Sequence, residues 1–443
     1  MNGTDLFPAG PLALQPLAPQ PQASRAPLVW NIPGSKSITN RALPLAALSE
    51  GSTLLSGVLH SDDTLHMRRA LEAMGIVIDD VDETTLRVHG GRSRLRAPNE
   101  PLFIGNSGTT VRFLTALAAL VPGQVTLVGD EHMQKRPISD LVQGLGQLGV
   151  RIDCPTGCPP LTVFGGKLPG GTVSMPGDKS SQYFSALLMV APCASGPLRL
   201  VVEGELVSRP YVDITLTMMQ AFAAPAQAST HAFDIAPPEG GYQPRDYAIE
   251  PDASSASYAF ACAAATGLTV TVPNLGLGAL QGDYAFVDLL EQAGAEVIRG
   301  TDATTVRGTG RLRGLDVDMH HISDTVMTLA AIAPLFDGPT TIRNVENIRI
   351  KETDRLEATV TELTRLGQKV SSGRDWLRIE PAPVTPCIVR SYSDHRMAMA
   401  FAVLGLCRPG VSIETPSCVK KTYPTFWQDL RHVYAHVDQA APF

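Results

Sequence analysis

The feature of this chain that most constrains its fold is an internal repeat with a period of roughly 70 residues. Four segments, which begin at Met67, Leu141, Phe286 and Ala358, carry apolar residues at helical spacing, then a glycine, then a β-branched stretch. A glycine at that point predicts the left-handed residue that ends a helix, and the stretch after it predicts a strand. The chain is therefore expected to fold as several copies of one α/β unit.

Two further copies raise the number of repeats to six. A weaker copy begins at Leu216, where the glycine is replaced, and a sixth helix begins at Thr425 with no strand after it. Three copies in each half predict two domains of similar build, and 443 residues are too many for a single ordinary core. The predicted domains are residues 34–250 for the first and residues 29–33 with 251–443 for the second, after a mobile N-terminal tail of residues 1–28 that is rich in Pro, Ala and Gln.

A second set of helical segments lies between the first, and each member becomes almost wholly apolar after a polar start. Such segments predict buried helices whose first turns carry polar and charged side chains. The free N–H groups and the dipole at a helix N-terminus favour anions, so we expect an anion-binding site, placed by default in a cleft between the two domains. The segments begin at Ser37, Asn106, Ser180, Asp252, Ser323 and Ser393.

Composition argues against several classes of function. The net charge is -7 and the pI is about 5.8, without a basic tract, which argues against a nucleic-acid-binding surface. No stretch of 18 apolar residues is free of Pro, Gly or charge, so no membrane span is expected. The seven scattered cysteines, several of them in apolar runs, are typical of free thiols in a reducing cytosol, so we expect a cytoplasmic protein.

The sequence does not favour a metal site. Cys154 and Cys158 form one close pair without the second pair that a zinc site needs. His320, His321 and Asp324 lack the i, i+4 histidine spacing of zinc hydrolases. Asp324 itself has two open interpretations, because it could cap the apolar helix that follows or act as a general base.

Cations recur beside these helix starts. Lys36 and Arg41 follow a Gly-Ser pair without Walker A spacing, so they are either solvated residues of a capped helix or partners for phosphate and carboxylate groups. Lys351 and Arg355 stand four residues apart with Glu352 beside them, which fits a solvated helix as well as a tuned proton-transfer group. Taken together, cations around two carboxylates suit two anionic substrates and a proton transfer.

Seven motifs, taken in order, resemble the 5-enolpyruvylshikimate-3-phosphate (EPSP) synthase family, whose members are 3-phosphoshikimate 1-carboxyvinyltransferases. They are PGSKSITNRA, GNSGT, KRPI, SSQ, DASSASY, KETDRL and DHRMAM, and the resemblance extends from residue 33 to about residue 425. It implies a two-domain α/β fold, each domain an inside-out barrel of three βαββαβ-type repeats with buried helices. It also implies transfer of the enolpyruvyl group of phosphoenolpyruvate to the 5-hydroxyl of shikimate 3-phosphate, by addition and elimination through a tetrahedral intermediate, with closure of the cleft to exclude water.

The resemblance assigns roles to particular residues. Lys36 is expected to contact both substrates and to serve as an acid, Asp324 to be the base toward the 5-hydroxyl, and Glu352 to exchange a proton with the vinyl carbon. Besides Lys36 and Asp324, the residues expected to hold shikimate 3-phosphate are Ser37, Arg41, Ser180, Ser181, Gln182, Ser208, Tyr211, Asn347 and Lys351. Besides Lys36, those expected around phosphoenolpyruvate are Asn106, Gly108, Arg136, Gln182, Arg355, Arg396 and Lys421.

The resemblance also bears on cofactors, partners and inhibitors. It implies a monomer with no metal or organic cofactor, placed in the shikimate pathway to chorismate and the aromatic amino acids, and inhibited by glyphosate in competition with phosphoenolpyruvate. The sequence departs from the family at Ser107 and Thr110, where many members have Ala, and at Phe113, where many have Pro. Lys179 is a further addition beside the expected phosphate-binding serines. The response to glyphosate is therefore left open.

Two rival functions remain to be weighed. The sister family transfers enolpyruvyl to UDP-N-acetylglucosamine and typically uses a cysteine in a mobile loop, whereas residues 1–153 of this chain contain no cysteine. A non-catalytic paralogue that binds phosphorylated metabolites would be expected to have lost Lys36, Asp324 or Glu352, and all three are present. Both alternatives are disfavoured.

Overall fold

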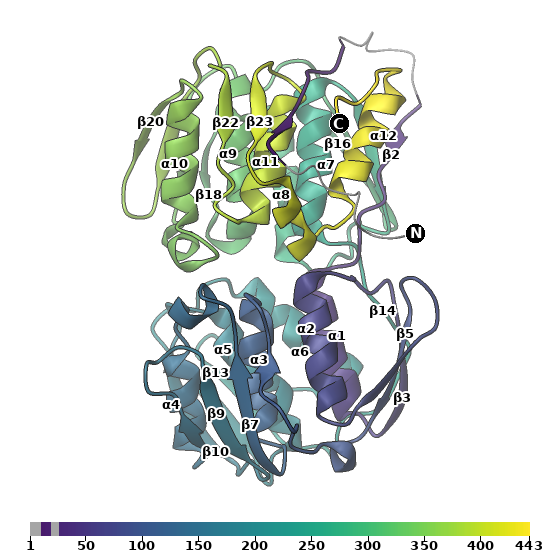
Figure 1. The fold of residues 1–443 in the computed structure, drawn as a ribbon, viewed down its shortest axis with the longest axis vertical. Helices are drawn as coiled ribbons and strands as arrows, with labels where there is room; N and C mark the ends of the chain where they lie inside the picture. The colour runs from purple at the N-terminus through teal and green to yellow at the C-terminus, as the bar shows by residue number, and fades with distance from the viewer. Residues whose placement is uncertain (1–9, 19–25) are drawn as a thin grey trace. The chain divides into compact units, whose positions relative to one another are not determined.

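The computed structural model describes residues 10–18 and 26–443 (Figure 1). The chain divides into two compact units. The first unit is Gly34–Glu250, and the second unit combines Met1–Pro33 with Pro251–Phe443. Both are mixed α/β structures in which helices and short sheets alternate along the chain, as the repeat predicts. In the described part of the chain, no helix is both long and apolar enough to cross a bilayer.

The first unit contains three four-stranded sheets of one topology. In each sheet, the first two strands pair in parallel, the third strand pairs antiparallel with the second, and the fourth pairs antiparallel with the third. The fourth strand precedes the third in the chain. One repeat of the sequence thus corresponds to one sheet. The sheets are β14 (Tyr247–Ala248), β3 (Gly51–Ser56), β5 (Leu86–Gly90), β4 (Val77–Asp80); β6 (Leu102–Phe103), β7 (Gly123–Val128), β9 (Leu161–Gly165), β8 (Arg151–Asp153); and β10 (Gly171–Pro176), β11 (Leu198–Glu203), β13 (Ala232–Ile235), β12 (Gln227–Ala228).

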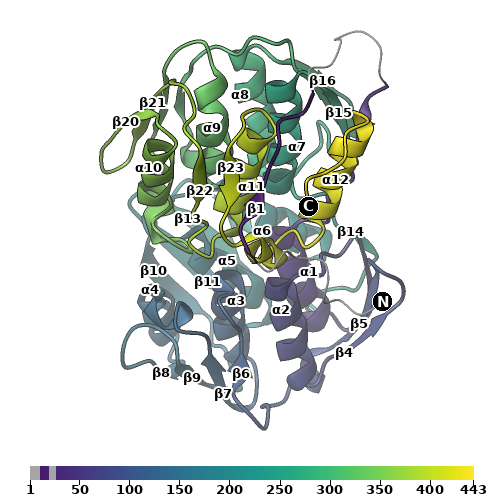
Figure 2. The same cartoon turned by 45° about the horizontal axis from the view of Figure 1, so that its top comes forward.

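The second unit repeats this topology, but two of its strands come from the N-terminal segment. β2 pairs in parallel with β15. β1 pairs antiparallel with β23 in a three-stranded sheet (Figure 2). These strands fill the positions that the repeats of the second half leave open. The sheets are β2 (Leu28–Val29), β15 (Thr269–Pro273), β17 (Ala303–Arg307), β16 (Glu296–Arg299); β18 (Asp316–Asp318), β19 (Thr340–Arg343), β21 (Leu377–Glu380), β20 (Lys369–Ser372); and β22 (Cys387–Val389), β23 (Val411–Ile413), β1 (Leu12–Ala13).

The expectation that residues 1–28 form a mobile tail is wrong for residues 10–18. Leu12 and Leu14 are buried, and Tyr434 donates its hydroxyl hydrogen to the carbonyl oxygen of Gln15 at 2.6 Å. Because the sixth copy has no strand of its own after its last helix, β23 would otherwise leave an open edge, and β1 covers it. Of the rest of the expected tail, residues 1–9 and 19–25 lie outside the described residues, and residues 26–28 lead into β2, which begins at Leu28.

The amphipathic helices of the six repeats end alike. A residue with positive φ stands one or two positions past the end of each helix, and in four repeats it is the glycine that the sequence pattern marks, for example Gly75 at 98° and Gly367 at 84°. Ala223 takes the same conformation with φ 63° in the copy that lacks the glycine, and Asp438 does so with φ 55° in the sixth. The helices are α2 (Asp62–Ala73), α4 (Ser139–Gln147), α6 (Pro210–Ala221), α8 (Phe286–Ala293), α10 (Arg355–Arg365) and α12 (Phe426–His436).

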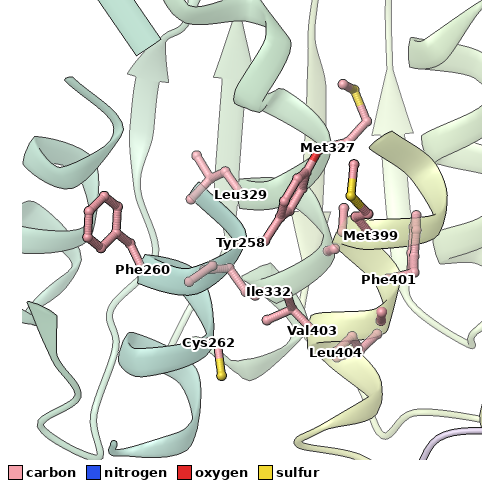
Figure 3. Close-up of a cluster of buried hydrophobic side chains, with 14 of the residues drawn as sticks. Tyr258, Phe260, Cys262, Met327, Leu329, Ile332, Met399, Phe401, Val403 and Leu404 are labelled. Carbon is pink, nitrogen blue, oxygen red and sulfur yellow. The ribbon is translucent and has the colours of Figure 1, made fainter. Parts of the chain in front are cut away.

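The apolar helices with polar starts are buried, as predicted. In the second unit α7, α9 and α11 pack against one another, and Tyr258, Ile332 and Phe401 lie in the shared core between them (Figure 3). Five of the six begin with a Ser or Asp whose side chain accepts a hydrogen bond from the first turn. The helices are α1 (Lys36–Leu48), α3 (Gly108–Ala118), α5 (Ser181–Val190), α7 (Ala253–Thr266), α9 (Val326–Ile332) and α11 (His395–Gly405).

Candidate active site

Arg355 is the centre of a buried charge cluster in the second unit. It is the first residue of α10 and only 2% exposed, and its guanidinium contacts three carboxylates. The Arg355 nitrogens lie 3.0 Å from Asp324, 2.7 Å from Glu352 and 2.7 Å from Asp394. Burial alone would lower the pKa of Arg355, but the charges of Asp394, Glu352 and Asp324 outweigh it, so the pKa is raised above its ordinary value.

Two more cations complete the cluster. Arg396 at the start of α11 donates to Asp324 at 2.8 Å, and Lys421 at the end of η8 (Pro416–Lys421) lies 3.1 Å from Glu352. Asp324 and Glu352 are thus each placed between two positive charges, an arrangement that favours their ionised forms. The cluster brings together five residues that the sequence assigns to the site.

The geometry rules out one of the interpretations that the sequence left open for each of these residues. Residues 351–354 are not helical, because they lie in the bends between η7 (Glu346–Ile350) and α10, so a solvated helix is the wrong interpretation of this motif. Asp324 lies within the short helix η5 (His320–Thr325), and Thr325 takes the N-cap position of α9. Asp324 is therefore not a helix cap, and its carboxylate is directed instead to Arg355 and Arg396.

The remaining predicted residues of the second unit lie beside this cluster in the chain. Asn347 in η7 donates its amide hydrogen to the hydroxyl of Ser323 at 3.1 Å, one residue before Asp324. Lys351 directly precedes Glu352 and follows the last residue of η7.

In the first unit, Lys36 begins α1 and is tied to the start of α2. Its ammonium lies 3.6 Å from the carboxylate of Asp63, and the two side chains are 13% and 5% exposed. Ser35, the N-cap of α1, accepts a hydrogen bond from the N–H of Ile38. Lys36 therefore stands at a capped helix start with its charge balanced by a buried carboxylate.

Arg41 lies deeper than its predicted role suggests. It is 1% exposed, it donates to Thr215 at 2.7 Å and to the carbonyl oxygens of Ser37 and Tyr211 at 2.8 and 2.9 Å, and a further contact reaches Ser185 at 3.3 Å. Burial lowers the pKa of Arg41 to about 10. A guanidinium has five N–H donors, so the contacts leave a single N–H on Nη1 for a ligand. Arg41 thus mainly braces Ser37 and Tyr211, which are both predicted site residues.

Asn106, Gly108 and Arg136 form one group. Arg136 donates to the side-chain oxygen of Asn106 at 3.2 Å and to its carbonyl oxygen at 3.3 Å. A Cβ added to Gly108 would lie 2.6 Å from a guanidinium nitrogen of Arg136, so any side chain at this position would push the cation away. The glycine therefore allows the guanidinium of Arg136 to lie close to the start of α3.

The serines of the third repeat surround the start of α5. Ser180 is the N-cap, and its hydroxyl accepts from the N–H of Gln182 at 3.3 Å, while Ser181 opens the helix and is 4% exposed. Ser208 has φ 52° in the turn before α6, and the carbonyl oxygen of Tyr211 accepts from Arg41. A non-glycine residue with positive φ is uncommon outside sites where the surroundings fix the backbone.

A family model described as EPSP synthase (3-phosphoshikimate 1-carboxyvinyltransferase) matches residues 24–430 of this chain. The chain belongs to this family. Curated relatives named 3-phosphoshikimate 1-carboxyvinyltransferase include that of a Nostoc species, 45% identical over 400 residues that make up 89% of this chain and 94% of the relative. The relative from Klebsiella pneumoniae is 42% identical over 428 residues, 95% of this chain and 98% of its own length.

Solved structures agree with the fold of an EPSP synthase. Two structures of EPSP synthase from Acinetobacter baumannii superpose with TM-scores of 0.80 and 0.78 at 24% and 23% identity, and each covers at least 96% of this chain. The first is covered to 97% and the second to 98% of its own length. The predicted fold and family are confirmed, and this EPSP synthase family member is an enolpyruvyl transferase.

Three of the four departures from the usual EPSP synthase pattern are buried in this family member. Ser107 caps α3 and its hydroxyl lies 2.7 Å from that of Thr110, which in turn donates to the carbonyl oxygen of Asp63 at 3.2 Å. Phe113 is 1% exposed, with its ring 5.2 Å from the guanidinium of Arg41. Lys179 is half exposed and pairs with Asp140 on α4 at 3.0 Å, and this pairing raises the pKa of Lys179.

Sequence reasoning missed several residues that contact the predicted ones. Asp63 and Asp394 look like ordinary helix-start acids, but they pair with Lys36 and Arg355. Arg112 could have been noticed, because it is a lone charge in the apolar run that follows GNSGT. Within the described part of the chain, no group of three or more His, Cys, Asp or Glu residues is arranged to hold a metal ion.

Asp283 is a further buried carboxyl that the sequence did not single out. It lies in η4 (Gly282–Ala285), is 4% exposed, and accepts a hydrogen bond from the hydroxyl of Ser254 in α7. Burial and the charge of Asp324 together raise the pKa of Asp283 to about 7, although the charge of Arg396 opposes them. Asp283 therefore changes its charge close to neutral pH.

Replacing Asp283 by Asn is expected to alter the pH dependence of stability. The folded chain keeps this proton up to about pH 7 and the unfolded chain loses it near pH 4, so the folded state binds more protons between these values. The contribution of Asp283 to the free energy of unfolding is complete below about pH 4 and is lost as the pH rises toward 7. The wild type should therefore lose at most about 1.4 kcal/mol per pH unit relative to Asp283→Asn. Urea unfolding of both proteins at several pH values measures this difference, and parallel curves would contradict it.

Proposed function

We propose that this chain transfers the enolpyruvyl group of phosphoenolpyruvate to the 5-hydroxyl of shikimate 3-phosphate and releases inorganic phosphate, as a step of the shikimate pathway. The observation that carries the proposal is the cluster around Arg355, in which Asp324 and Glu352 each lie between two cations. The reaction needs one carboxylate to accept a hydroxyl proton, another to exchange a proton with carbon, and cations for anionic substrates. The membership of the EPSP synthase family supports the same reaction.

Each carboxylate has one role in the addition step. The 5-oxygen of shikimate 3-phosphate forms a bond to C2 of phosphoenolpyruvate, and Asp324 accepts the proton of that hydroxyl. Glu352, which takes up a proton from solvent once phosphoenolpyruvate has drawn its cations away, gives this proton to C3, so the vinyl carbon becomes a methyl group and the tetrahedral intermediate forms.

The elimination step reverses the role of Glu352. It takes a proton back from the methyl group while the bond between C2 and the phosphate oxygen breaks, and Lys36 gives a proton to the leaving phosphate. Asp324 then releases its proton to solvent, and Lys36 regains one, so the enzyme returns to its initial state. The residues of the chain supply every proton transfer, and the sequence of steps needs no metal or organic cofactor.

Substrate binding would also activate the two carboxylates. Arg355, Arg396 and Lys421 are paired with carboxylates of the chain in this structure. The phosphate and carboxylate groups of phosphoenolpyruvate would compete for these cations. As the cations turn to the substrate, Asp324 and Glu352 lose part of the positive charge that stabilises their ionised forms, so both become stronger bases.

The substrate contacts are proposed as the sequence assigns them. Shikimate 3-phosphate is held through its phosphate, carboxylate and hydroxyl groups, and phosphoenolpyruvate through its two anionic groups. We further propose a monomeric, cytoplasmic enzyme that glyphosate inhibits in competition with phosphoenolpyruvate; the seven cysteines, all free thiols, fit a reducing compartment. The residues are Ser37, Arg41, Ser180, Ser181, Gln182, Ser208, Tyr211, Asp324, Asn347 and Lys351 for shikimate 3-phosphate, Asn106, Gly108, Arg136, Gln182, Arg355, Arg396 and Lys421 for phosphoenolpyruvate, and Lys36 for both.

Phosphate release tests the proposed function. The protein is mixed with phosphoenolpyruvate and either shikimate 3-phosphate or UDP-N-acetylglucosamine, and inorganic phosphate is measured over time. We expect release only with shikimate 3-phosphate, accompanied by the enolpyruvyl product in equal amount. Release only with the sugar nucleotide would assign the chain to the sister activity, and release with neither would overturn the proposal.

A further inference from the structure

Arg112 is the one charged residue of α3, and it reaches across to the start of α5. The side chain is 8% exposed, and its guanidinium lies 5.4 Å from the ring of Tyr183. The hydroxyl of Tyr183 donates to the carbonyl oxygen of Pro137 at 2.7 Å, which holds the ring in place. Arg112 is thus a cation in a fixed position next to Gln182.

The hydrogen bonds around Gln182 determine which way its amide faces. Arg112 donates from Nη1 to Oε1 of Gln182, and Nε2 of Gln182 donates to the hydroxyl oxygen of Thr109 at 3.2 Å. A guanidinium can only donate, so a flipped amide would set its NH₂ hydrogens against those of Arg112. The amide oxygen is therefore held toward Arg112 and the NH₂ group away from it.

This orientation leaves one N–H of the Gln182 amide for a ligand. The NH₂ group has two hydrogens, and the bond to Thr109 uses one. With its oxygen occupied by Arg112, the amide offers a ligand a donor and no equally accessible acceptor. A group that only accepts, such as a phosphate or carboxylate oxygen, matches this donor.

We propose that Arg112 is a positioning residue that locks the amide of Gln182 with its NH₂ group toward the substrate, so that Gln182 selects an anionic oxygen of phosphoenolpyruvate. The proposal rests on the proposed function, in which Gln182 contacts this substrate. Arg112 acts through Gln182 and has no assigned contact with the reacting atoms. In its absence the amide would rotate between two orientations, only one of which offers a donor.

A double-mutant cycle on the full-length protein tests the coupling between the two residues. Gln182→Ala is expected to raise the KM for phosphoenolpyruvate by about 10- to 100-fold, the usual effect of losing a hydrogen bond to a charged group, with a smaller change in kcat. Arg112→Met is expected to raise KM by a similar factor. In the double variant the two factors should not multiply, because the amide that Arg112 orients is already gone. Multiplied factors would overturn the proposal.

Two further variants separate positioning from folding. Arg112→Lys keeps a group that only donates and is expected to restore most of the affinity that Arg112→Met loses. Arg151 is another arginine of the first unit that stacks on an aromatic ring, since its guanidinium lies 4.2 Å from the centre of the Phe164 ring. Arg151→Met is expected to leave KM unchanged. If Arg112→Met and Arg151→Met both raised KM in proportion to a lowered unfolding midpoint, the role of Arg112 would be merely structural and the proposal would be overturned.

A measurement without turnover distinguishes failure of this proposal from failure of the proposed function. The side-chain amide signals of Gln182 in a ¹H–¹⁵N spectrum are identified by their loss in Gln182→Ala. In the wild type we expect two well-separated NH₂ signals, one of which shifts when phosphoenolpyruvate is added. In Arg112→Met we expect both signals to move close to those of a glutamine whose amide group rotates between its two orientations. Unchanged signals in Arg112→Met would overturn the positioning role, whatever phosphate release shows.

Discussion

Replacing Arg355 by Met is expected to lower the stability of the second unit by about 3–5 kcal/mol, the usual cost of removing one partner from a buried ion pair. Arg355 contacts Asp324, Glu352 and Asp394, and Asp394 is fully buried. Without the guanidinium these carboxylates would remain in the interior with less compensating charge. The change should lower the midpoint of thermal unfolding by roughly 10 °C in a unit of this size.

Arg299 provides the matched control for this prediction. It also bridges two carboxylates of the second unit, at 2.6 Å from Asp288 and 2.8 Å from Glu291, but both partners are about half exposed. Exposed ion pairs contribute little, so Arg299→Met should cost less than about 1 kcal/mol. Calorimetry of the two variants beside the wild type measures the difference. An equal shift of the unfolding midpoint in both variants would mean that the burial of Arg355 among its carboxylates adds nothing to stability.

The repeat could be predicted from the sequence because its signals are local. Helical spacing of apolar residues and a glycine at the helix end depend only on neighbours in the chain. Ala223 and Asp438 mark the limit of such signals, because both adopt the left-handed conformation at the end of the repeat's helix although neither is a glycine. In those two copies the surrounding fold determines the backbone, and the residue type alone would not have revealed it.

The N-terminal strands could not be predicted for the opposite reason. β1 and β2 are two residues long, and their partners β23 and β15 lie about 400 and 240 positions away in the chain. The Pro-rich composition around them indicates a tail, and only the open edge of the sixth repeat explains why Leu12 and Leu14 become buried.

The candidate site shows the same division between local and distant signals. Arg355, Glu352 and Arg396 could be singled out because they stand in long motifs with the family's pattern. Their partners Asp394 and Asp283 depend on contacts between helices of different repeats, which spacing in the sequence does not reveal. The burial of Arg41 could not be predicted for the same reason, because all but one of its polar contacts are to residues at least 144 positions away in the chain.

Removing the carboxylate of Asp324 is expected to lower kcat by at least ~100-fold, the lower end of the effect of a general base. In Asp324→Ala no group accepts the proton of the 5-hydroxyl as the new bond forms. The same change leaves Arg355 and Arg396 without one of their carboxylate partners, so these cations should bind an anionic substrate at least as tightly as before. The KM for phosphoenolpyruvate should therefore stay the same or fall while kcat collapses.

A fall in kcat without a rise in KM identifies a proton-transfer role, because a merely misfolded site would lose affinity together with rate. Asp316→Asn is the control: Asp316 is an exposed aspartate of the same unit, paired with Arg343 at 2.6 Å, and its loss should leave both constants unchanged. Steady-state measurement of phosphate release with shikimate 3-phosphate at saturation gives both constants for the three proteins. Turnover of Asp324→Ala within a few fold of the wild type would reject Asp324 as the base and leave Glu352 or Lys36 to accept the hydroxyl proton.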